Sequence, residues 1–391
     1  MTEPVAVTGV GVVSALGHGA EAFWAGLLGG VSGLRPIRRF ALPSGAPILG
    51  GEVPPIAVAD VARSAIGRRI DWVSLLALAA CRLALEDAGL DPARLAPART
   101  ALGLGSAWGN LRETTVFLDR LFARGAGNPL LFPNLVFNAP LSYASIELGI
   151  TGPTAMVAAQ EASGEAAIAW GADVIEDDAA DVCLAGGAEE LGPVVHQVLR
   201  ETGVTTSGVP RPLDPAADGA CLGEGAAVLV LEPLARARAR GAKVYARLSA
   251  SSGRAVPAPV HGWPRDPAPV AETLRPLVRD ADLVMAAASG NPALDALEAA
   301  ALTAAFGERR VLVTSVRGAL GDFGAVGALA AAAAVLAVDS GLVPPTLGLV
   351  PPARAGLDVV VGRARRAPVR VAVVDGLARG GFCCPLRLEA A

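Results

Sequence analysis

Strands and helices are predicted to alternate along the second half of the chain, and this alternation limits the possible folds more than any other feature of the sequence. Short runs of valine, leucine and alanine at 282–289, 310–316 and 369–375 are typical of strands buried on both faces. The segments 292–306 and 324–338 lie between them and have the length and composition of helices. Such alternation favours a mostly parallel sheet covered by helices on both faces. We therefore expect an α/β protein.

The first half of the chain shows the same pattern. It has an amphipathic helix over 71–89, and its valine-rich or glycine-bounded runs predict strands at 4–13, 100–105, 181–185 and 226–232. Because both halves alternate, we expect an internal duplication with two stacked α/β halves, although no residue-level repeat is visible. We place the division at residues 1–240 and 241–391, within one compact unit.

Composition narrows the class of protein. The 391 residues are 52% hydrophobic and 18% charged, which is enough apolar surface for a large core. The net charge of −4 comes without a block of like charges, and this argues against nucleic acid or an anionic membrane as a partner. The longest apolar run, 324–338, is shorter than the roughly 20 residues needed to span a bilayer. We expect it to be a helix buried on all sides.

The cysteines show no metal-ligand spacing, and most lie inside apolar runs. Buried free thiols in a reducing cytoplasm are the expected state of all five: Cys81, Cys183, Cys221, Cys383 and Cys384. The sequence predicts a cytoplasmic protein with no metal site and no cofactor.

The stretch 151–170, TGPTAMVAAQEASGEAAIAW, has the outline of a strand, a sharp turn and a buried helix. Such a turn presents one side chain at a helix N-terminus, where the helix dipole favours an anion. A nucleophile is expected at its tip, but the tip carries Glu161. Two interpretations stay open: Glu161 caps the helix and fills the position, or it acts directly near a substrate.

Five segments together carry a resemblance to a known family. VAVTGVGVVSALG at 5–17 and the segments 23–40, 71–90, FPNLVFNAP at 132–140 and 211–242 resemble, in the same order, the β-ketoacyl synthases of the thiolase fold. The similarity runs from about residue 4 to about residue 388. It implies a thiolase-like, duplicated architecture of five layers, α-β-α-β-α.

The chain departs from this family where the family does its chemistry. Active ketosynthases place a cysteine at the nucleophile turn, and Glu161 stands at that position. The family's two histidines correspond to Ser289 and Asp322, and Arg317 stands for the lysine of the second histidine's loop. The three histidines of the chain, His18, His196 and His261, occupy neither place. The resemblance therefore implies vacated catalytic positions and no catalytic residue.

The closing segment DGLARGGF at 375–382 shows a further change. It resembles a loop beside the family's active site, and Arg379 stands at the place of the loop's gating aromatic residue. An arginine beside Glu161 and Asp322 is expected to fill the emptied pocket with an ion pair.

One branch of the family tolerates these losses. Chain-length factors, the β subunits of type II polyketide synthases, replace the cysteine, often by glutamine, and pair with an active ketosynthase as a heterodimer. The Gln160-Glu161 pair resembles that branch. The resemblance implies a catalytic ketosynthase subunit as partner, with acyl carrier protein engaged through the complex.

In such a heterodimer the subunit without catalysis acts as a wall of the tunnel that receives the growing chain. The helix around 110–124 and the loop around 131–141 are its expected lining. The tunnel candidates are Thr115, Phe117, Leu118, Leu121, Phe132 and Phe137, and ordinary packing is the alternative for each.

Two further hypotheses stay in view. The chain could be a divergent malonyl-thioester decarboxylase or hydrolase that uses Glu161, or a scaffold that binds acyl carrier protein or an acyl ligand. A 1:1 complex with a cysteine-containing ketosynthase favours the chain-length factor, whereas a homodimer that releases carbon dioxide favours the enzyme. The sequence does not predict the chain length or distinguish an aromatic from a polyene product.

Overall fold

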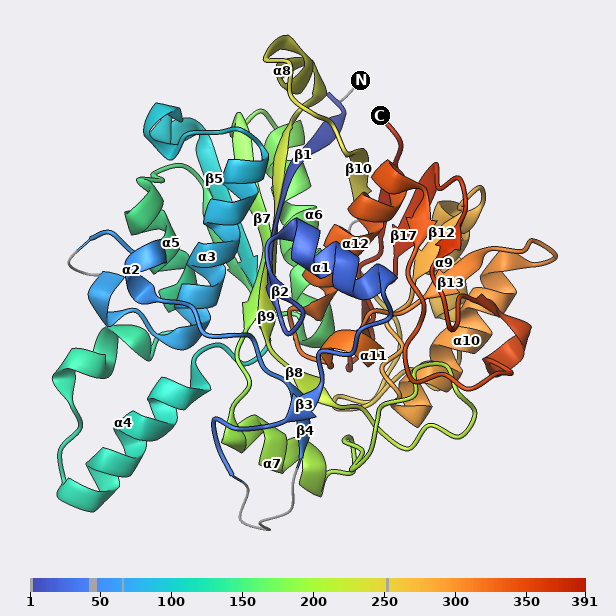
Figure 1. The fold of residues 1–391 in the computed structure, drawn as a ribbon, viewed down its shortest axis with the longest axis horizontal. Helices are drawn as coiled ribbons and strands as arrows, with labels where there is room; N and C mark the ends of the chain where they lie inside the picture. Colours follow the sequence, from blue (N-terminus) through green and yellow to red (C-terminus); the bar gives the residue numbers. More distant parts are fainter. Residues whose placement is uncertain (1–2, 42–47, 65–66, 251–252) are drawn as a thin grey trace.

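The computed structural model describes residues 3–41, 48–64, 67–250 and 253–391. Most of its strands form a twelve-stranded sheet that runs through both halves of the chain (Figure 1). Eleven of its strands follow one another across the sheet in the order β15 (Asp358–Val359), β13 (Leu312–Thr314), β12 (Leu283–Met285), β17 (Val371–Val374), β19 (Leu386–Glu389), β10 (Ala246–Ala250), β1 (Val5–Ser14), β9 (Gly225–Pro233), β7 (Val182–Glu189), β5 (Thr100–Gly105) and β6 (Thr154–Val157). The short strand β2 (Gly17–His18) pairs with β1.

The strand directions differ from the mostly parallel sheet that the sequence predicts. The strands at both ends, β6-β5-β7 and β17-β12-β13-β15, are parallel. Between these two groups, the successive pairs β7-β9, β9-β1, β1-β10, β10-β19 and β19-β17 are antiparallel. A continuous apolar run indicates burial on both faces, which β1, β7, β9 and β17 have, but it does not indicate direction.

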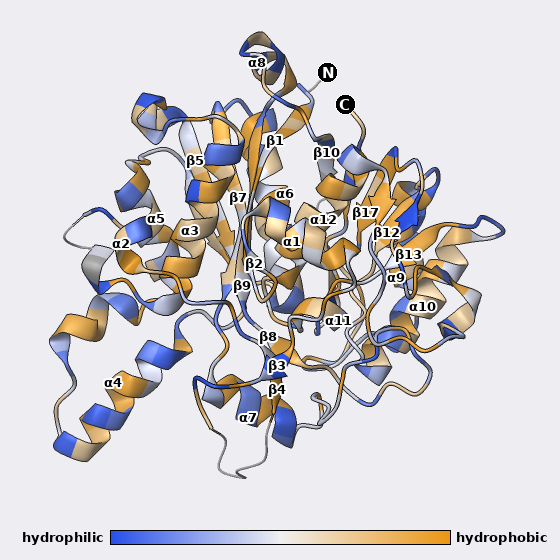
Figure 2. Ribbon diagram, in the orientation of Figure 1, coloured by the Kyte–Doolittle hydropathy of each residue, from blue (hydrophilic) through white to orange (hydrophobic). Residues whose placement is uncertain are grey.

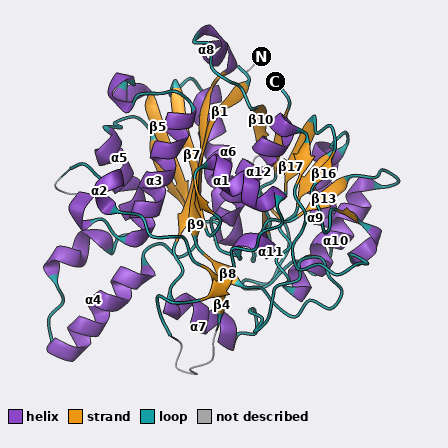
Figure 3. Ribbon diagram, in the orientation of Figure 1, coloured by secondary structure: helices purple, strands orange, loops and turns teal. Residues whose placement is uncertain are grey.

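Helices separate and cover the two halves of the sheet (Figure 3). On the outside of the first half lie α3 (Trp72–Asp87) and α5 (Ala139–Leu148), and on the outside of the second half lie α9 (Ala268–Val278) and α10 (Pro292–Phe306). Between the two halves lie α6 (Ser163–Glu176) and α12 (Val326–Ser340). This is the five-layered α-β-α-β-α arrangement that the resemblance implied. The two halves are joined in the sheet by the pairing of β1 with β10, and a division near residue 240 stays a prediction.

The central helices pack unusually closely. Every residue of α12 from Val326 to Val338 is buried, as expected for the apolar run at 324–338. Gly164 of α6 lies against α12, and a Cβ at this position would be 2.6 Å from the backbone nitrogen of Ala328. Small residues on both helices therefore allow this contact. Within the described ranges, no helix is long and apolar enough to cross a membrane.

The remaining elements are short or lie at the periphery. Among the peripheral helices, α4 (Leu111–Arg124) and α7 (Pro193–Glu201) lie at the bottom of Figure 1. The others are α1 (Ala20–Leu28), α2 (Val58–Val61), α8 (Leu234–Ala239), α11 (Arg317–Leu320), the 3₁₀ helices η1 (Gly67–Arg69), η2 (Pro92–Arg94), η3 (Pro97–Arg99), η4 (Pro129–Asn134), η5 (Gln160–Ala162) and η6 (Arg354–Gly356), and the strands β3 (Arg35–Pro36), β4 (Leu49–Gly51), β8 (Leu222–Gly223), β11 (Arg254–Ala255), β14 (Leu342–Val343), β16 (Arg365–Arg366) and β18 (Phe382–Cys383).

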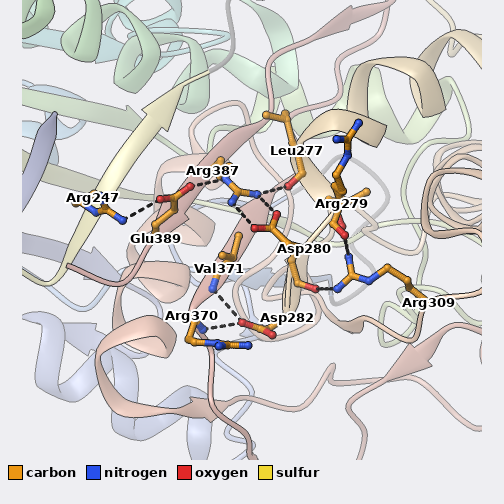
Figure 4. A network of polar contacts seen from close by, with 12 residues as sticks. Arg247, Leu277, Arg279, Asp280, Asp282, Arg309, Arg370, Val371, Arg387 and Glu389 are labelled. Carbon is orange, nitrogen blue, oxygen red and sulfur yellow. Dashed lines mark hydrogen bonds and ion pairs between the residues drawn. The ribbon is translucent and has the colours of Figure 1, made fainter. Parts of the chain in front are cut away.

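A network of ion pairs connects the second half of the sheet with the loop after α9 (Figure 4). Arg387 of β19 binds Asp280 at 2.7 Å and Glu389 at 2.7 Å, and Glu389 in turn binds Arg247 of β10 at 3.0 Å. Asp280 and Arg247 are largely exposed, so solvent weakens these pairs and they contribute little to stability. The network holds strand ends together and lies apart from the site described next.

Candidate functional site

Glu161 lies at a sharp turn between β6 and α6, as the sequence predicts. The backbone of Gln160 has a φ of 51°, a left-handed conformation that side chains rarely adopt. The hydroxyl of Ser163 holds the turn by donating to the carbonyl of Gln160 at 2.6 Å and accepting from the amide of Ala159 at 3.0 Å. The turn places the Glu161 carboxylate beside the N-terminal end of α6, where the helix dipole stabilises negative charge.

Arg379 binds the carboxylate of Glu161 at two points. Its Nε donates to Oε1 at 2.6 Å and its backbone nitrogen donates to Oε2 at 3.1 Å. The two side chains are only 11% and 19% exposed, so solvent screens the pair little. The ion pair expected between these two residues is present, and Asp322 does not share it.

Asp322 pairs instead with Arg317 of α11. Arg317 is 2% exposed, and its Nη1 lies 2.5 Å from Oδ1 of Asp322. Burial lowers the pKa of Arg317, but the negative charges of Asp322 and other nearby carboxyl groups outweigh it and raise that pKa overall. A basic residue therefore neutralises Asp322, the residue that the resemblance places at the second family histidine.

Glu165 is a buried acid that the sequence gave no reason to select. It lies on α6 and is fully buried, and neither carboxyl oxygen has a hydrogen-bond partner among the described residues. Burial raises its pKa to about 8, although Arg317 lowers it, so the group is mostly neutral at pH 7. Gly327 of α12 makes room for it, since a Cβ there would collide with the carboxyl group. α6 carries three acidic residues, Glu165, Asp173 and Glu176, and no pattern in the sequence distinguishes the buried one from the two that are exposed.

Glu298 and Asp375 form a second buried acidic group near Arg317. Oε2 of Glu298 and both carboxyl oxygens of Asp375 have no hydrogen-bond partner among the described residues. If both groups are ionised, neither has a proton to donate to the other. Burial and the adjacent Asp375 raise the pKa of Glu298 well above its ordinary range, and burial raises that of Asp375 to about 6. A proton on Glu298 supplies the missing donor, so we assign one shared proton to this pair at neutral pH.

A small cavity lies beside the Glu161–Arg379 pair. It is lined by both residues and by Asp322, Trp108 and Phe323, with apolar side chains of α7 on the far side. Its volume is about 30 Å³, which is room for about two water molecules. Trp108, which follows β5, is a lining residue that the sequence analysis missed. The cavity in this state has no space for an acyl chain.

The structure does not bring all the vacated positions to this cavity. Ser289 is 1% exposed, and its backbone nitrogen donates to Asp295 at 3.0 Å while its hydroxyl has no partner in the described structure. It does not line the cavity that Glu161, Asp322 and Arg379 share.

Thiols and imidazoles are also kept away from the cavity. None of His18, His196 and His261 lines it, and all five cysteines are buried, with burial raising the pKa of each thiol. A thiolate nucleophile and an imidazole acid are therefore both absent from the lining of this cavity. The described residues contain no group of three metal-ligating side chains with the geometry of a metal site.

The six tunnel candidates lie on or beside α4 and η4, where Thr115, Phe117, Leu121 and Phe137 are half-buried. Phe117 packs edge to face on Phe132, with ring centroids 6.4 Å apart, and Phe137 packs over Gly109. Leu118 and Phe132 are 39% and 60% exposed. Thr115 lines a second small cavity between α4 and α7, and none of the six lines the cavity beside Glu161. Their role in a tunnel stays a prediction.

Comparisons with known proteins agree with this fold and site. The β-ketoacyl synthase N-terminal domain model matches residues 2–237, and the C-terminal domain model matches residues 271–350. The folded architecture and these matches define a ketosynthase-like protein of the thiolase fold. The chain belongs to the β-ketoacyl synthase family.

Several relatives come from type II polyketide synthases. The chain is 32% identical to the granaticin polyketide putative β-ketoacyl synthase 1 of Streptomyces violaceoruber, over 98% of this chain and 97% of the relative. It is 33% identical to the tetracenomycin polyketide synthase ketoacyl synthase beta subunit of Streptomyces glaucescens, over 97% and 96%. A solved structure described as the ishigamide ketosynthase/chain length factor superposes with a TM-score of 0.92 and 29% identity, over the full length of both chains. The chain is thus a protein of the ketosynthase/chain-length factor type.

Proposed function

We propose that the chain is a non-catalytic chain-length factor that pairs with an active β-ketoacyl synthase and shapes the tunnel that sets the length of a polyketide or polyene acyl chain. The Glu161–Arg379 ion pair carries this proposal, because a carboxylate bound by an arginine stands where the family has its nucleophile. A decarboxylative condensation needs a nucleophile and acids or donors placed around one carbonyl. The cavity beside the pair is nearly filled and lacks the thiol and the imidazoles.

The surface of the first half supports pairing with another subunit. Large apolar side chains are exposed on and near α4 and on α7, among them Val116, Phe122, Leu130, Phe132 and Val198, at 50% to 81%. Clustered exposed apolar residues mark protein interfaces more often than free surface. Figure 2 shows hydrophobic stretches alternating with hydrophilic ones along α4.

The edge of the sheet supports the same interface. Strand β6 is the last strand on this side and leads directly into the Glu161 turn, and three of its four residues are half-buried. An open strand edge is suited to pairing with a partner strand. The relatives include proteins named as both alpha and beta ketoacyl synthase subunits, which fits a chain that assembles with a related one.

Co-expression tests this proposal. We expect the chain to purify as a 1:1 complex with a cysteine-containing ketosynthase. We expect acyl carrier protein to bind this complex and not the chain alone. Expression alone is expected to give unstable protein, because the apolar surface of α4 and α7 stays uncovered. A stable homodimer that releases carbon dioxide from malonyl carrier protein, with activity lost in Glu161→Ala, would instead establish the divergent decarboxylase that uses Glu161.

A further inference from the structure

Helix α4 depends on acceptors from outside its own segment. No residue of the helix is buried, and the side chain of its N-cap residue Asn110 makes no capping hydrogen bond. That side chain instead donates to the carbonyl of Val136 at 3.3 Å. The first amides of a helix have no partner within the helix, so α4 needs other groups to bind them.

Two consecutive glutamates at the end of β7 bind this region: Glu189 binds the loop before α4, and Glu190 supplies an acceptor to the helix itself. Glu189 accepts from the hydroxyl of Ser106 at 2.7 Å and from the amides of Ala107 at 2.7 Å and Trp108 at 3.2 Å. Glu190 accepts from the amide of Arg112, in the first turn of α4, at 2.9 Å. The exposures of Glu189 and Glu190 are 1% and 5%, so both act from a rigid strand end inside the protein.

The space under the first turn of α4 is not completely filled. A cavity of about 10 Å³, close to the size of one water molecule, lies between this turn and the start of α7. Arg112, Thr115, Val195 and Glu190 are among its lining residues, and Oε2 of Glu190 has no partner among the described residues. Glu190 both lines this cavity and binds the Arg112 amide, so removing its side chain enlarges the cavity under the first turn of α4 and takes away the acceptor that holds this turn.

We propose that Glu190 is a positioning residue: it fixes the direction in which α4 leaves the body, and through α4 it sets the length of the acyl chain that the complex makes. The inference rests on the proposed function, in which α4 forms part of the tunnel wall. It assigns the selection of chain length to a buried residue that lies outside the six tunnel candidates.

The protonation state of Glu190 makes glutamine a matched control substitution. Burial raises its pKa to about 8, although the amide and charge of Arg112 lower it, so the group is mostly neutral at pH 7. Glutamine has nearly the same shape as a neutral glutamic acid and keeps a carbonyl oxygen that can accept from the Arg112 amide. Alanine removes the acceptor, and aspartate shortens its reach by one methylene.

The experiment uses the complex with its ketosynthase and measures the distribution of product lengths by mass spectrometry, together with hydrogen exchange of α4. In Glu190→Ala we expect the Arg112 amide to exchange about fivefold faster, the usual effect of a lost cap. The distribution of product lengths should shift by at least one extension unit, and the total amount of product should stay within the same order of magnitude as that of the wild type. Glu190→Gln should behave like the wild type, as should Glu201→Ala, a control on the exposed end of α7.

The outcomes separate this inference from the proposed function. Faster exchange with an unchanged product distribution in Glu190→Ala would overturn the inference, as would a shift of equal size in Glu190→Gln. If the alanine variant does not assemble, Glu190→Asp replaces it, and we expect a smaller shift in the same direction; an unchanged distribution there overturns the inference. Leu118→Ala tests whether α4 forms part of the tunnel wall. A shift in product length in Leu118→Ala but not in Glu190→Ala refutes only the role of Glu190. An unchanged product length in both variants refutes the proposal that α4 lines the tunnel.

Discussion

Arg379 holds both carboxylate oxygens of Glu161, one through its guanidinium at 2.6 Å and one through its own backbone nitrogen at 3.1 Å. These two residues are 218 positions apart and come from the two halves of the fold. Both oxygens of this carboxylate already accept a hydrogen bond from the same residue. The contact therefore reaches, from the opposite half of the protein, the residue that the resemblance places at the family's nucleophile position.

The Glu161–Arg379 pair should contribute to stability and not to catalysis. We expect Glu161→Ala and Arg379→Ala each to destabilise the chain, because each leaves one largely buried charge without its partner. A double-mutant cycle by chemical denaturation should give a coupling energy of about 1–3 kcal/mol. Glu161→Gln in the complex should make wild-type products at an unchanged rate, and a loss of synthesis in this variant would indicate a chemical role.

The contact between Glu165 and Gly327 predicts that a glycine-to-alanine substitution in this helix lowers stability instead of raising it. Alanine in place of a helical glycine normally stabilises a helix by up to about 1 kcal/mol. Here Gly327→Ala should destabilise the protein by about 1–3 kcal/mol, because the new methyl group collides with the Glu165 carboxyl. In a Glu165→Ala background the same substitution should become neutral or stabilising. Equal effects in both backgrounds, measured by thermal unfolding, would show that the two residues do not compete for space.

Glu165 also predicts how stability changes with pH. Its pKa is raised from 4.5 to about 8 in the folded protein, so between these values the folded state binds more protons than the unfolded state. The contribution of this group to the free energy of unfolding therefore falls as pH rises from about 4.5 to 8, by about 1.4 kcal/mol per pH unit. Glu165→Gln should remove this dependence, so its advantage over the wild type should grow by about 3 kcal/mol between pH 5 and pH 8. A constant difference, measured by denaturant titration at both pH values, would contradict the assignment of a buried neutral acid.

The tunnel wall gives a prediction about products. Leu118 is more exposed than Phe117, which packs on Phe132 of η4. We expect Leu118→Ala to lengthen the product of the complex with little loss of stability, and Phe117→Ala to lengthen it at a cost of about 3 kcal/mol or less. Product mass spectrometry of the complex checks both, with Val209→Ala as a matched exposed control away from α4. Unchanged products in every variant over 110–137 would place the wall elsewhere.

Much of the fold could be predicted from the sequence because burial and periodicity are local signals. The helix expected over 71–89 is α3, with Asp71 as its N-cap, and the strand expected at 100–105 has the same limits in the structure. The strand expected to end at Ala185 continues to Glu189, since glycines at 186 and 187 allow β7 to pack closely on its neighbours. Strand direction was not predictable in the centre of the sheet, where parallel and antiparallel strands have the same composition.

The site was predictable only where the family pattern marks a position. The turn at Glu161 and its partner Arg379 were found in this way. The pairing of Asp322 with Arg317, the clearance that Gly327 gives to Glu165, and the cap that Glu190 gives to α4 depend on segments that meet only in three dimensions. No spacing in the sequence marks such contacts.

The most direct test of the central claim is the intact mass of each subunit after the complex is incubated with acyl-loaded carrier protein. The account predicts that the ketosynthase partner gains the acyl group on its cysteine and that this chain keeps its unmodified mass. The same result is expected with Glu161→Ala. An acyl adduct on this chain, formed at the rate of synthesis and lost in that variant, would contradict a non-catalytic role.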